Sequence, residues 1–75
     1  MNALPQEVRL NIINRQIDTW EQQRYSYQIE HRVYTRIGGD EVLKNLVAEM
    51  GKCEKAIDAL TELRDLITNE GTVKE

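Results

Sequence analysis

His31 and Cys53 are the only histidine and the only cysteine of this 75-residue chain, and they are the first candidates for metal or nucleophilic chemistry. Di-metal four-helix proteins place a glutamate three residues before each histidine, whereas Gln28 stands before His31. A catalytic thiol needs an adjacent base, and the sequence shows none for Cys53. We therefore expect no catalytic residue, no metal site and no cofactor. We expect both side chains to pack in a helical seam, and any further role of either stays open.

Carboxylates recur along the second half of the chain and could in principle perform acid–base chemistry. They lie at steps of three to five residues: Glu49, Glu54, Asp58, Glu62 and Asp65. Lysines and an arginine alternate with them, which is typical of a solvated helix face. We therefore predict that the protein is not an enzyme.

The densest cluster of basic and aromatic residues spans 24–36 and comprises Arg24, Tyr25, Tyr27, His31, Arg32, Tyr34 and Arg36. The plainest interpretation is structural, with tyrosines in a seam and arginines paired to acids such as Glu21 and Glu30. A protein-binding surface is the second interpretation, because arginine and tyrosine dominate such surfaces. Nucleic-acid binding is the third, because a net charge of −3 disfavours it.

Two apolar seams with alternating steps of three and four residues must position these groups. The first runs Leu10, Ile13, Ile17, Trp20, Arg24, Tyr27, His31, Tyr34, and the second runs Leu43, Leu46, Met50, Cys53, Ile57, Leu60, Arg64, Ile67. If the chain folds back at Gly38-Gly39, each seam residue meets a partner whose number sums with its own to 77. This pattern predicts an all-α fold, a long antiparallel two-helix hairpin.

The ends of the two helices follow from local signals. Pro5 fits the first turn of a helix, so the first helix is expected over about 5–37. Gly38 is a left-handed helix terminator, and Asp40 is expected to cap the second helix over about 40–69.

The chain is expected to form one domain over 1–75, because it is too short for two. Gly71 is the expected end of the second helix. The segments 1–4 and 71–75 are expected to fray.

Several seam positions carry residues that do not suit a simple apolar contact, namely Arg24, His31 and Arg64. We expect Glu49 or Glu54 to pair with Arg24, and Glu7 to pair with Arg64, because unpaired buried charge is costly.

Two further residues carry structural expectations. Trp20, opposite Ile57, is expected to be the largest core side chain. Gly51 lies across from Ser26 within a helix, which indicates either a close approach by another helix or plain tolerance of a surface glycine.

Apolar residues outside the seam predict self-association. They include Ile29, Val33, Val47, Ala56, Leu63 and Leu66. A helix that is apolar on two sides needs contacts on two sides, so we predict a homodimer that forms a four-helix bundle. A trimer or a three-helix arrangement is the alternative.

We therefore predict a small non-enzymatic protein that acts through self-association and contact with an unidentified protein partner, as an adaptor, regulator or inhibitor. The candidate partner surface lies near the glycine turn and comprises Tyr25, Ile29, Arg32, Val33, Arg36 and Ile37. The alternative is nucleic-acid binding through residues 24–36.

The cellular setting follows from absences in the sequence. A single cysteine cannot form an intrachain disulfide and favours a reducing cytoplasm. The sequence shows neither a signal peptide nor an apolar run long enough for a membrane span, so no membrane partner is expected.

Overall fold

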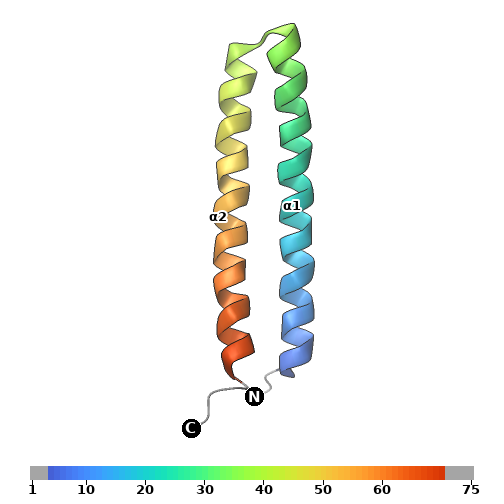
Figure 1. Ribbon diagram of the computed structural model, residues 1–75, viewed down its shortest axis with the longest axis vertical. Coiled ribbons are helices and arrows are strands. Elements are labelled where there is room, and N and C mark those ends of the chain that lie inside the picture. Colours follow the sequence, from blue (N-terminus) through green and yellow to red (C-terminus); the bar gives the residue numbers. More distant parts are fainter. Residues whose placement is uncertain (1–3, 71–75) are drawn as a thin grey trace.

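The computed structural model describes residues 4–70, which form two antiparallel helices that lie side by side (Figure 1). Helix α1 spans Gln6–Ile37 and helix α2 spans Asp40–Glu70. The all-α hairpin is confirmed, and each predicted outer boundary is within one residue of the observed one. The predicted helix end at Gly71 and the predicted fraying of 1–3 and 71–75 lie outside the described residues.

The start of α1 differs slightly from the prediction for Pro5. Its carbonyl accepts the first helical hydrogen bond, from the Arg9 N–H at 3.0 Å, so Pro5 occupies the capping position and α1 begins at Gln6. Proline has no N–H to leave unsatisfied and is tolerated on either side of this boundary. Glu7 in the first turn and Arg36 in the last turn suit the helix dipole.

The turn between the helices depends on both glycines. Gly38 has φ of +90° and ψ of 152°, and its N–H donates to the Tyr34 carbonyl at 2.9 Å. The positive φ was predicted, but this ψ lies outside the left-handed helical region and is accessible almost only to glycine. Gly39 has φ of +143° and its carbonyl accepts from the Leu43 N–H, so Gly39 takes the capping position expected for Asp40. Asp40 is instead the first residue of α2, where its negative charge interacts favourably with the helix dipole.

The aliphatic core lies in the half of the hairpin away from the turn, which we call the open half (residues 6–21 and 55–70). Ile13, Ile17 and Ile67 are each 6% exposed and form one buried cluster, against which Leu10, Ile57 and Leu60 pack. The turn half (residues 22–54) contributes two further buried residues, Leu46 and Cys53.

Side-chain pairs between α1 and α2 report the register. Arg9 bonds to Glu70 at 3.0 Å, Arg24 lies 3.8 Å from Glu54, and Arg64 donates to Asn14 at 2.9 Å. The residue numbers of these pairs add to 79, 78 and 78, close to the predicted 77. The matched antiparallel register is therefore confirmed to within one or two residues.

The predicted ion pairs of the seam are confirmed only in part. Glu54 is the acid that approaches Arg24, as one of the two expected partners. The prediction for Arg64 was wrong, since it bonds to Asn14 rather than to Glu7. Glu7 precedes Asn14 by seven residues, which is about 10 Å along a helix and too far for this guanidinium.

Trp20 is not the largest core side chain, because 36% of it is exposed. A seam between only two helices is too narrow to cover an indole, and the one fully buried side chain in the described residues is the small Cys53. A Cβ built on Gly51 would meet nothing within 4 Å. No approach within the hairpin therefore requires glycine at this position.

Candidate functional site

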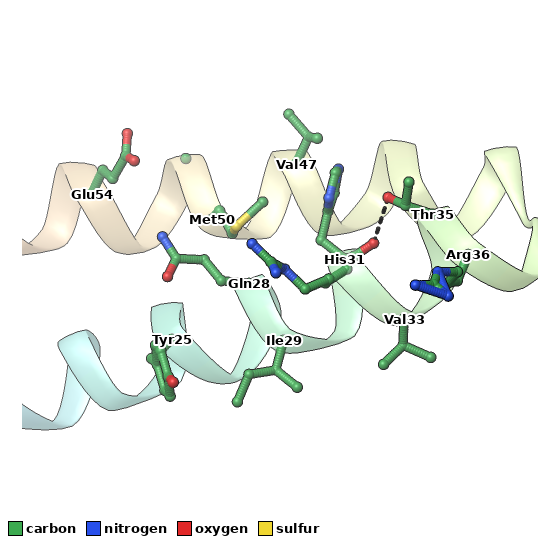
Figure 2. Close-up of a pocket in the computed structure, with 12 residues that line it drawn as sticks. Tyr25, Gln28, Ile29, His31, Val33, Thr35, Arg36, Val47, Met50 and Glu54 are labelled. Carbon is green, nitrogen blue, oxygen red and sulfur yellow. Dashed lines mark hydrogen bonds between the residues drawn. The ribbon is translucent and has the colours of Figure 1, made fainter.

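All six residues of the predicted partner surface are exposed. Tyr25 is 64% exposed, Ile29 49%, Val33 48% and Ile37 69%, and Arg32 and Arg36 are exposed as well. Figure 2 shows Tyr25, Ile29 and Val33 pointing away from α2, on the outer face of α1. These side chains are therefore free to contact another molecule without any change in the hairpin.

Five of the six residues, all except Ile37, line a shallow open hollow in the turn half. On α2 this hollow is lined by Val47, Met50, Gly51 and Glu54. Figure 2 shows His31 and Met50 between the helices, with Val47 directed away from α1. The missing side chain at Gly51 leaves the hollow open. Its shape suits a broad contact better than an enclosed small-molecule site.

The partner surface does not lie on a single face of α1. Tyr25, Ile29, Val33 and Ile37 follow one another every four residues, and each step turns the direction of the side chain by about 40° around the helix. The row therefore passes from the side of the hollow across the outer face to the opposite side. A partner that contacts all of these residues has to cover the outer face of α1.

The arginines of this region differ in their partners. Arg24 lies in the seam and reaches Glu54, as a structural role requires. Within residues 4–70, no salt bridge joins Arg32 or Arg36 to an acid. The expectation that the arginines pair with Glu21, Glu30 and the acids of α2 is therefore correct for Arg24 alone.

The histidine, the cysteine and the carboxylates that were considered for chemistry do not form one cluster. Across residues 4–70, no three His, Cys, Asp or Glu side chains gather closely enough to hold a metal ion. Cys53 is 1% exposed, and His31 is half-buried between the helices. Of the carboxylate row, Glu49 binds Lys52 at 3.4 Å and Glu54 lies 3.8 Å from Arg24, while Asp58, Glu62 and Asp65 are exposed. We find no arrangement of a nucleophile and a base in this part of the chain.

The charged pair at the open end was not anticipated. The Arg9 guanidinium donates two hydrogen bonds to the Glu70 carboxylate, at 3.0 and 3.2 Å. The hydrogen bond and charge of Arg9 lower the pKa of Glu70, and those of Glu70 raise the pKa of Arg9. In the predicted register, facing residues have numbers that add to 77. The numbers of Arg9 and Glu70 add to 79, which is close enough for the pair to have been expected from the sequence.

Two exposed apolar residues of the open half, Val8 and Ile12, were not anticipated from the sequence, whereas Leu63 and Leu66 were named among the apolar residues outside the seam. Val8, Ile12, Leu63 and Leu66 are between 39% and 66% exposed. The spacing of Leu4, Val8 and Ile12, four residues apart, repeats that of Tyr25, Ile29 and Val33 and was the available signal. The hairpin thus has exposed apolar side chains in both halves.

Comparison of the chain with protein-family models, with curated proteins and with solved structures found no match. Neither α1 nor α2 contains an apolar stretch that could span a membrane. The exposed surfaces of the hairpin are therefore the features from which a function can be inferred.

Proposed function

We propose that this chain is a non-enzymatic helical-hairpin protein that acts by self-association and by contact with another protein, as an adaptor, regulator or inhibitor. One observation carries the proposal. Within residues 4–70, eleven large apolar side chains are exposed, whereas the buried core contains five residues. Exposed apolar side chains in such excess are characteristic of surfaces that other chains cover.

The small core supports self-association. A chain of 75 residues with one cysteine, and with no metal-binding group of side chains in residues 4–70, seldom gains enough stability from its own core. Covering an exposed Leu, Ile or Val contributes roughly 1.5–3 kcal/mol, so a few such residues match the stability of a small domain. Packing two hairpins into a four-helix bundle supplies this burial.

The turn half supports contact with a different protein. Tyr25, Arg32 and Arg36 combine an exposed aromatic ring with two guanidinium groups that have no ion pair in residues 4–70. Ile29 and Val33 lie between them in sequence and are half exposed. An apolar centre with arginine and tyrosine around it is the usual composition of a protein-binding hot spot.

A pull-down with the tagged chain tests this surface. The double substitution Ile29→Asp and Val33→Asp should remove a specific partner, because it places two charges at the centre of the contact. The control is Gln22→Asp with Ser26→Asp, two exposed residues of α1 with the same spacing of four. Equal recovery of the partner with both variants, at unchanged helicity, would refute the assignment of this surface.

Nucleic-acid binding remains the second candidate, because Arg32 and Arg36, which form no ion pair within residues 4–70, line the same hollow as the exposed Tyr25. Such binding would weaken steeply with salt. A mobility-shift assay at low salt that shows no complex excludes it.

A further inference from the structure

We propose that a second copy of this chain packs on one specific side of the hairpin, the side that carries Ala56, Ala59, Leu63 and Leu66 of α2 beside Ile12 of α1. We call it the uncharged side. This proposal rests on the self-association in the proposed function. It assigns the surface through which the two copies contact each other.

The contacts between the helices define two opposite sides. The bond between Arg9 and Glu70 crosses one side of the seam. Residues seven apart lie on the same side of a helix in a hairpin of this kind, so Leu63 and Ala56 share the side of Glu70. The bond between Arg64 and Asn14 crosses the other side.

The uncharged side carries a second seam on α2. Ala56, Ala59, Leu63 and Leu66 follow steps of three, four and three residues, which is the spacing of the seam that packs against α1. Leu63 is 45% exposed and Leu66 is 66% exposed. An apolar row with this spacing is the surface into which a further helix packs its side chains.

Helix α1 extends the same side. Ile12 is 40% exposed, and Trp20 lines a small hollow with Gln16, Thr19 and Gln23. Gln16 and Gln23 follow Arg9 by one and two heptads, so this hollow lies on the uncharged side. The partial exposure of the indole is then explained, because a second hairpin would cover it.

The charges select a second copy as the occupant of this side. A surface that packs against its own copy must not repel itself. Two ion pairs on this side are internal, Arg9 with Glu70 and Lys52 with Glu49, and Glu49 precedes Ala56 by one heptad. Glu30, one heptad after Gln23, also lies on this side and forms no ion pair within residues 4–70, whereas the other charges of the side are compensated within each copy.

On the opposite side of the open half, the acidic residues are not compensated by ion pairs within residues 4–70 of one copy. Glu7 and Glu21 lie one heptad before and after Asn14, and Asp58 and Asp65 follow Gly51 of the hollow by one and two heptads. One guanidinium, that of Arg64, bonds to Asn14 among these four carboxylates. Two copies packed on this acidic side would place like charges together, which is costly.

The dimensions of the hairpin allow a stable dimer. A helix of 32 residues is about 48 Å long, and the hairpin is about 20 Å wide. One side therefore offers roughly 900 Å², against about 800 Å² per partner in a stable interface. The two copies have to overlap along nearly their whole length, which produces a four-helix bundle.

Sedimentation equilibrium of the full chain tests the inference with two matched variants. Leu66→Glu and Val47→Glu each place a charge at an apolar residue of α2 that is more than half exposed, and they lie on opposite sides of the seam. We expect a dimer for the wild type, a dissociation constant about thirtyfold higher or more for Leu66→Glu, and a change within about threefold for Val47→Glu. Circular dichroism at matched concentrations checks that the helices are retained.

The outcomes separate two failures. A wild-type chain with the mass of one copy at micromolar and higher concentrations contradicts self-association itself. A wild-type dimer that survives Leu66→Glu, or that Val47→Glu dissociates equally, overturns the assignment of the side and leaves self-association standing.

Quenching of Trp20 fluorescence by acrylamide provides a second measurement. In the wild type, the quenching constant should fall about twofold as the concentration passes through the dissociation constant, because the second copy covers the indole. In Leu66→Glu it should stay at the monomer value over the same range. A wild-type value that does not change during dimerisation places the second copy elsewhere and overturns the inference.

Discussion

The open half and the turn half of the hairpin use different residues in the same seam. In the open half, Ile13, Ile17 and Ile67 form an aliphatic cluster in which each side chain is 6% exposed. In the turn half, the α1 seam continues with a half-buried guanidinium, imidazole and phenol rings: Arg24, Tyr27, His31 and Tyr34. Leu46 and Cys53 supply the buried contacts there.

The difference reflects how each half is held together. In the turn half, two residues connect the helices, so bringing them together costs little conformational entropy. The open half is far from this connection, and it depends on apolar packing and on the bond between Arg9 and Glu70. We infer that stability is concentrated in the open half, whereas the seam of the turn half tolerates amphipathic residues.

The largest effect is expected from truncating the open-half core. Ile17→Ala should lower the free energy of unfolding by about 2–4 kcal/mol, because it removes buried methyl groups and leaves a cavity. His31→Ala in the turn half should lower it by about 1 kcal/mol or less, since the imidazole is only half-buried. Urea denaturation followed by circular dichroism measures both.

Equal losses for Ile17→Ala and His31→Ala would contradict the contrast between the two halves. Because self-association adds to stability, both variants are compared with the wild type at one protein concentration.

A smaller effect is expected at the turn. Gly38→Ala should lower the free energy of unfolding by about 1–2 kcal/mol, because a φ of +90° with an extended ψ is strained for any residue with a Cβ. A Cβ at Gly38 would meet nothing within 4 Å, so the loss measures backbone strain without a steric clash. Thermal unfolding provides the measurement.

Gly51→Ala is the matched control, since its Cβ also meets no atom within 4 Å but the backbone is helical. It should raise the free energy of unfolding by up to about 1 kcal/mol, which is the gain in helix propensity. A loss of stability at Gly51 would indicate that another chain approaches this glycine closely, the alternative left open by the sequence.

The smallest effect is expected from pH at the open end. Arg9 lowers the pKa of Glu70 below its ordinary value of 4.5, so the pair stabilises the hairpin above that pH and the contribution is lost as pH falls through the lowered pKa. Arg9 stays charged throughout this range, because a guanidinium is protonated at every acidic pH, and Glu70 raises its pKa further. Amide exchange in the last turn of α2 should therefore accelerate as the pH falls below 4.5 through the lowered pKa of Glu70, while the turn half is unaffected.

Carboxyl chemical shifts of Glu70 report its titration directly. Arg9→Gln should return the pKa of Glu70 toward its ordinary value. A Glu70 that titrates identically in the wild type and in Arg9→Gln would show that the bond does not persist in solution.

Much of the architecture was present in the residue spacing. The seams around Gly38 and Gly39 predicted two helices with bounds correct to about one residue and a register near 77. The candidate surface was placed in the turn half, and its members are exposed. These features follow from local periodicity and from backbone conformations that glycine alone adopts, so a one-dimensional pattern is enough to predict them.

The errors concern the cap of α2 and the contacts across the seam. The capping position fell on Gly39 instead of Asp40, Arg64 reached Asn14 instead of Glu7, and Trp20 remained partly exposed. Val47 and Leu63, which flank the same seam in the sequence, are on opposite sides of the hairpin once the crossing contacts are known. The pattern of residues therefore determined which segments coil and how they pair. The packing of the two helices decided the axial offset, the covered fraction of each side chain and the division into two sides, because these depend on the summed contacts of many side chains at once.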